Sequence, residues 1–115
     1  MSKPEPPPKD EGYIVSTELI KFIRKKCTSP EYIREKAIEL IKERDCFGYK
    51  KYGQHLRTKD GRDDIEDARQ EIGDLMQYLF KAKMNYKKTT EISELVLVLM
   101  DLINNEYYPS FRHEE

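Results

Sequence analysis

The stretch DARQEIGDLMQYLFKA, residues 67–82, sets the fold class of this 115-residue chain. Its apolar residues recur at helical spacing, which predicts a helix with one side packed against a core. Asp67, Glu71 and Asp74 are spaced four and then three residues apart, so they share another side of that helix, flanked by Tyr78. Like charges so placed repel by roughly 0.2–0.5 kcal/mol per pair on an exposed helix. The acidic side is therefore either simply solvated or occupied by something positive.

Helix signals continue before this stretch. The long helix itself is predicted to run from near Asp63 to about Tyr86. The segment TSPEYIREKAIELIKERDCFG precedes it and predicts a helix with Ser29 as N-cap and Pro30 at the first helical position. Two glycines are candidate ends for that helix: Gly48 and Gly53.

Two further helices complete the predicted fold. VSTELIKFIRKKC predicts a short N-terminal helix, and TTEISELVLVLMDLINNEYY predicts a last helix that Pro109 terminates. Hydroxyl residues are the candidate caps: Ser16 or Thr17 for the first helix, and Thr89 or Thr90 for the last. The predicted fold class is all-α, a helical bundle of three main helices plus a short N-terminal helix.

Composition limits the class of protein further. Residues 1–12 are Pro-rich and charged, which predicts a disordered segment, and residues 13–115 are long enough for a single helical domain. The formal net charge of −1 gives no overall attraction to nucleic acid, so we expect no stable nucleic-acid binding. The start of the chain lacks the apolar stretch of a signal peptide, and no apolar run reaches the roughly 18 residues of a membrane span. We expect a cytoplasmic protein that does not associate with membranes.

A basic segment, defined as residues 48–62, lies directly before the acidic side of the long helix. It contains a single carboxylate, Asp60. Its cations are Lys50, Lys51, Arg57, Lys59 and Arg62. The acidic side itself has almost no cation three or four residues away, where a merely solubilising surface usually mixes signs. Mg²⁺ binds between carboxylate and phosphate oxygens in nucleotide sites, and Lys or Arg takes the remaining phosphate charge. This juxtaposition favours a site for a metal and a polyphosphate.

A second row of carboxylates lies on the preceding predicted helix. Glu35, Glu39 and Glu43 are four residues apart. If the two helices pack antiparallel, Glu39 and Glu43 would face Glu71 and Asp74 across a cleft. Glu35 is interpreted as a surface residue.

Residues of the basic segment are candidates for binding a substrate. Lys51 and Tyr52 in KKYG would hold phosphate and stack on a base, although a loop tyrosine more often serves local packing. Arg62 would clamp phosphate or pair with one of the two aspartates that follow it. Tyr78 is a further candidate because it flanks the acidic side. His55 is interpreted as a loop histidine and not as a general base.

The stretch EIGDLMQYLFKA resembles the ExxD motif helix of the MazG-like all-α nucleoside triphosphate pyrophosphohydrolases. The wider stretch ERDCFGYKKYG…GRDDIEDARQEIGDLMQYL resembles small, phage-type members of that superfamily, of the dATP/dGTP kind, over roughly residues 31–84. The resemblance implies Mg²⁺-dependent hydrolysis of a (deoxy)nucleoside triphosphate to monophosphate and pyrophosphate, with Mn²⁺ as a substitute ion. It also implies a homodimer or homotetramer, which we expect to bury the last helix around Leu95, Leu99 and Leu102. A virus-encoded member would act in the host cytoplasm.

The resemblance also implies which residues bind metal. Family members use an ExxE motif on one helix and ExxD on the next, and Glu71 and Asp74 match ExxD. The first motif departs from the pattern, because Glu39 and Glu43 are four residues apart and a leucine lies three before Glu43. On this basis Glu43, Glu71 and Asp74 are the predicted catalytic ligands, and Glu39 and Asp67 are further metal candidates.

Two other functions fit the same residues. One is a non-catalytic helical interaction module that docks a partner through its charged patches. The other is a phosphohydrolase acting on an alarmone such as a guanosine polyphosphate. Binding of divalent ions at Glu71 and Asp74 would separate an enzyme from a docking module.

Overall fold

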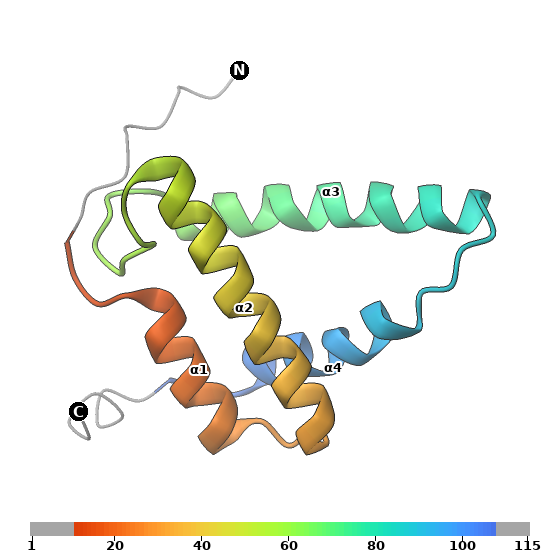
Figure 1. Cartoon of the computed structure of the whole chain (residues 1–115), viewed down its shortest axis with the longest axis horizontal. Helices are drawn as coiled ribbons and strands as arrows, with labels where there is room; N and C mark the ends of the chain where they lie inside the picture. Colours follow the sequence, from red (N-terminus) through yellow and green to blue (C-terminus); the bar gives the residue numbers. More distant parts are fainter. Residues whose placement is uncertain (1–10, 108–115) are drawn as a thin grey trace.

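The computed structural model describes residues 11–107, which form four helices and no strand (Figure 1). The helices are α1 (Val15–Lys26), α2 (Glu31–Tyr52), α3 (Asp64–Met84) and α4 (Thr90–Asn104). The all-α prediction, with three main helices and a shorter N-terminal one, is confirmed over this part of the chain. Most of the predicted disordered segment, residues 1–10, lies outside the described residues, as does Pro109.

The core forms where α1 and α4 pack against α2. Ile23 and Ile38 are its fully buried large side chains. Partly buried leucines and isoleucines of α1, α2 and α4 surround this core, including Leu95 and Leu102. α2 is therefore the central helix, and it fixes the positions of both of its neighbours.

α3 differs from the other helices because none of its residues is buried. In Figure 1 it diverges from α2 and is joined to α4 by a turn at its far end. The apolar residues Ile72, Met76 and Phe80, predicted to pack, are 52%, 63% and 63% exposed. A helix derives most of its stability from packing of its apolar face, so this face is suited to contact with another molecule.

Several predicted helix ends agree with the structure. Gly53 ends α2 with a φ of 75°, a backbone conformation that glycine adopts without steric cost. Asp63 caps α3, and its carboxylate accepts a hydrogen bond of 3.0 Å from the backbone N–H of Glu66. Thr89 occupies the N-cap position of α4, although its side chain makes no capping hydrogen bond. These ends depend on neighbouring residues alone, which is why the sequence predicts them.

Two predicted caps are wrong. Pro30, not Ser29, is the N-cap of α2, and its carbonyl accepts bonds from the N–H groups of Ile33 and Arg34. α1 begins after Ile14 rather than at a hydroxyl residue, because Ile14 forms an isolated β-bridge with Arg57 that ends the extended chain there. This start is set by a residue more than forty positions away, beyond the reach of a local capping signal.

Polar contacts join α4 to the rest of the core. The backbone N–H of Thr28 donates to Asp101 at 3.1 Å, and Lys36 Nζ lies 3.1 Å from Glu94 Oε1. The hydrogen bond from Lys36 lowers the pKa of the Glu94 carboxyl below its usual value. Burial raises the pKa of the nearby Cys27 thiol, and the negative charge of Asp101 raises it further. Cys27 is therefore a packed, weakly reactive thiol.

Within the described helices, none combines the length and the apolar character that crossing a membrane requires.

Candidate functional site

The acidic side of α3 lies where the helical spacing predicts. Glu71 and Asp74 are one turn apart and exposed, and neither makes an ion pair among residues 11–107. They are hard oxygen donors, and Mg²⁺ in phosphate-binding sites takes one or two carboxylates together with phosphate oxygens. In donor chemistry and accessibility, these two residues fit such an ion.

Asp67 is in a different situation from its two neighbours. Its carboxylate receives two hydrogen bonds from Arg62, from Nε at 3.2 Å and from a terminal guanidinium nitrogen at 3.4 Å. The sequence predicts that Arg62 clamps phosphate or pairs with one of the two aspartates that follow it. Its acidic partner in the structure is Asp67 rather than either of those two, and the binding of phosphate stays a prediction. Asp67 could bind a metal ion only by giving up this partner, so it fits the role of a metal ligand less well than Glu71 and Asp74.

The second acidic row lies on α2. Glu39 and Glu43 are both exposed on this helix. Over residues 11–107, no three His, Cys, Asp or Glu side chains lie close enough to hold one metal ion. The antiparallel arrangement predicts that the carboxylate rows of α2 and α3 meet around one ion. Within the described part of a single chain, they do not.

Two predicted substrate residues lie at the C-terminal end of α2. Lys51 Nζ lies 5.2 Å from the centre of the Tyr52 ring, and that ring is 64% exposed. Tyr52 is thus not occupied by local packing. Tyr78 is 68% exposed on α3. All three side chains are accessible to a ligand.

The loop between α2 and α3 is held in place by backbone hydrogen bonds to the chain before α1. The N–H groups of Thr58 and Lys59 donate to the carbonyls of Tyr13 and Glu11 at 2.9 and 3.1 Å. Near the end of the loop, the Asp60 carboxylate is buried and accepts a bond of 3.0 Å from the N–H of Arg62. The basic segment is therefore an ordered structure that ends at the acidic helix.

His55 is a loop residue, as the sequence predicts, but its partner is not predicted. Its Nδ1 lies 2.9 Å from Asp45 Oδ1 on α2. Ten residues separate the two, and the turn after Gly53 brings them together. A pairing that depends on the shape of a turn has no spacing signal in the sequence.

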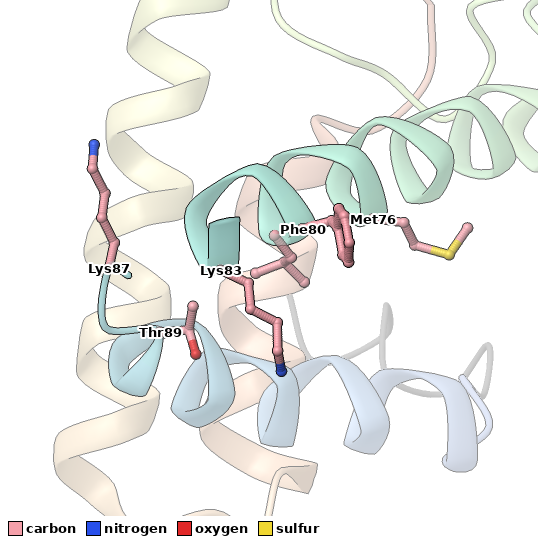
Figure 2. Close-up of a pocket in the computed structure, with 6 residues that line it drawn as sticks. Met76, Phe80, Lys83, Lys87 and Thr89 are labelled. Atoms are coloured by element: carbon pink, nitrogen blue, oxygen red, sulfur yellow. The ribbon is translucent and has the colours of Figure 1, made fainter. Parts of the chain in front are cut away.

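A groove of about 510 Å³ lies elsewhere, between the end of α3 and the start of α4. Figure 2 shows Met76, Phe80 and Lys83 on α3, with Lys83 extending across to α4 beside Thr89. None of the predicted site residues lines this groove. It belongs to the apolar side of α3 and not to the acidic side.

Comparison with known proteins does not assign the chain to a family: no family model, curated protein or solved structure matches it.

Proposed function

We propose that the chain is a Mg²⁺-dependent nucleoside triphosphate pyrophosphohydrolase that releases a monophosphate and pyrophosphate. The observation that carries this proposal is the order of charges along one ordered segment. The basic segment leads directly into the acidic side of α3, and the Arg62–Asp67 pair joins the two. A metal triphosphate needs carboxylates for the metal and cations for the remaining phosphate charge, in adjacent positions.

The residues would divide the work by chemistry. Glu71 and Asp74 would bind the ion, and Glu43 with Glu39 would complete its ligands from α2 of a second copy, since one chain does not bring the two rows together over residues 11–107. Mg²⁺ held there supplies positive charge against the phosphates and lowers the pKa of the attacking water.

The substrate is held by the side chains around the basic segment. Lys51 and Arg62 neutralise the phosphates, while Tyr52 and Tyr78 offer exposed rings to the base. Water would attack the α phosphorus, the bond from that phosphorus to the oxygen bridging the α and β phosphates would break, pyrophosphate would leave with that oxygen, and the proton of the water would pass to solvent. No covalent nucleophile is needed.

This function is proposed for a homodimer or larger assembly. Leu95 and Leu102, expected at the subunit interface, pack instead against the core of their own chain, and Leu99 is 42% exposed. An uncovered apolar face lies on α3, where Ile72, Met76 and Phe80 are exposed. The proposal requires that a second copy supply further carboxylates to the acidic side, because one chain does not complete a metal site over residues 11–107.

The exposed face of α3 also favours one alternative, a non-catalytic module that binds another protein through this helix. Such a module would need neither metal nor nucleotide. The alarmone alternative has no separate structural support.

The test is an initial-product assay with each common ribo- and deoxynucleoside triphosphate and Mg²⁺. We expect monophosphate and pyrophosphate in equal amounts from the preferred substrates. Orthophosphate and diphosphate as the first products would contradict attack at the α phosphorus. No turnover of any triphosphate, with protein that binds no divalent ion, would favour the interaction module.

A further inference from the structure

His55 docks the loop between α2 and α3 onto α2. Its Nδ1 lies 2.9 Å from Asp45 Oδ1, and its ring centre lies 4.6 Å from that of Tyr49 at an angle of 33°. Asp45 and Tyr49 are four residues apart, so they present one face of α2 to the imidazole. The side chains of His55 and Asp45 are only 31% and 23% exposed. The ring is thus seated between a carboxylate and an aromatic ring.

The bond to Asp45 joins this loop to a different element from the other contacts that hold the loop. The bonds of Val15, Thr58 and Lys59 tie the loop to the chain before α1, and Asp60 closes the turn before α3. The His55–Asp45 bond ties it to α2, two residues after Glu43 on that helix. It therefore links the loop that carries cations to the helix that carries a proposed metal ligand.

The position of this loop determines where its cations lie. Lys59 is exposed on the loop, and Arg62, which is proposed to neutralise phosphate, lies at the end of the loop beside Asp67. If the loop were released from α2, each substrate binding event would have to order it again, and the lost conformational freedom would weaken binding. An Nδ1–H donor is sufficient for the bond to Asp45, so a charged imidazole is not required.

We propose that His55 is a positioning residue. Through Asp45 and Tyr49 it holds the loop between α2 and α3 in the position where the cations of that loop meet the triphosphate. The inference rests on the proposed function. His55 itself touches neither substrate nor metal, so its loss should weaken substrate binding and leave the chemical step intact.

Four variants separate the hydrogen bond from the ring contact. His55→Ala removes both, His55→Phe keeps a ring beside Tyr49 but no donor, and His55→Asn keeps a donor near the Nδ1 position. Asp45→Ala removes the acceptor. We expect KM to rise about tenfold in His55→Ala, His55→Phe and Asp45→Ala, while kcat stays within about twofold of the wild-type value. His55→Asn should have a KM close to that of the wild type. The double change His55→Ala with Asp45→Ala should cost no more than either alone.

Hydrogen exchange provides a readout that does not depend on activity. The amides of Thr58 and Lys59 should exchange faster in His55→Ala and His55→Phe, but not in His55→Asn. Lys88→Ala, an exposed charge change on the turn before α4, is the control and should change neither KM nor exchange. Thermal melts of each variant establish that the chain is folded.

The outcomes are distinguishable. Hydrolysis with unchanged KM in His55→Ala, or with kcat reduced and KM unchanged, overturns the inference and leaves the proposed function standing. Absence of hydrolysis by the wild-type chain overturns the proposed function and the role of His55 in it. In that case, unchanged exchange of Thr58 and Lys59 in His55→Ala would also overturn the anchoring of the loop.

Discussion

Glu71→Gln and Asp74→Asn are each expected to reduce hydrolysis by at least about 100-fold while leaving the metal-free protein as stable as the wild type or slightly more stable. Even residues that only orient a metal ligand typically cost about 10- to 100-fold when changed, and these two are proposed as the ligands themselves. Both carboxylates are exposed on α3 and have no cation partner among the described residues. Removing one charge relieves repulsion of roughly 0.2–0.5 kcal/mol.

Thermal melts with and without Mg²⁺ complete this prediction. Mg²⁺ should raise the melting temperature of the wild type, because a ligand that binds only the folded state stabilises it. That increase should shrink in both variants. Glu91→Gln, which removes an exposed carboxylate from the first turn of α4, is the matched control and should keep the wild-type activity and the wild-type increase of melting temperature with Mg²⁺, although loss of a charge near a helix N-terminus lowers its own stability slightly. If both variants were destabilised with or without metal, the carboxylates would have a structural role instead.

Phe80→Glu and Met76→Glu are expected to convert an assembled protein into monomers and to lower its thermal stability. The two side chains are 63% exposed in the single chain and lie one turn apart, so together with Ile72 they form a continuous apolar face. A charge at the centre of a buried interface would remain unpaired and lose its solvation.

Light scattering at micromolar concentration measures this effect. The wild type should have the mass of a dimer or a larger closed assembly, and its melting temperature should rise with concentration. Gln77→Glu adds the same charge on the polar side of α3 and should leave the mass unchanged. A monomeric wild type would contradict the assembly and would leave the exposed face of α3 to some other partner.

The sequence predicts the local features of this chain and misses those that depend on distant residues. The glycine that ends α2 and the aspartate that caps α3 each act within one helical turn. The sequence therefore narrows the end of α2 to Gly48 or Gly53 and predicts the start of α3 near Asp63, and the structure has Gly53 and Asp63 at these ends. The start of α1 is set by the bridge between Ile14 and Arg57, for which the sequence carries no nearby signal.

The same distinction applies to the site. The common face of Glu71 and Asp74 follows from helix geometry alone. The pairing of Arg62 with Asp67 is less local. The carboxylate of Asp63 already caps α3, and Asp67 lies one turn further along the same side of that helix. The position of the α2 carboxylates relative to those of α3 depends on packing between helices. Within one chain, α3 buries none of its residues and packs little against the other helices.

Titration of Mn²⁺ followed by electron paramagnetic resonance tests most directly whether the acidic side of α3 holds a divalent ion. We expect the wild-type chain to bind Mn²⁺, to bind it more tightly with a non-hydrolysable nucleoside triphosphate present, and to release it to competing Mg²⁺. Glu71→Gln should abolish this binding, while Glu91→Gln should leave it unchanged. Equal Mn²⁺ binding by the wild type and Glu71→Gln, or no binding by either, would contradict the account.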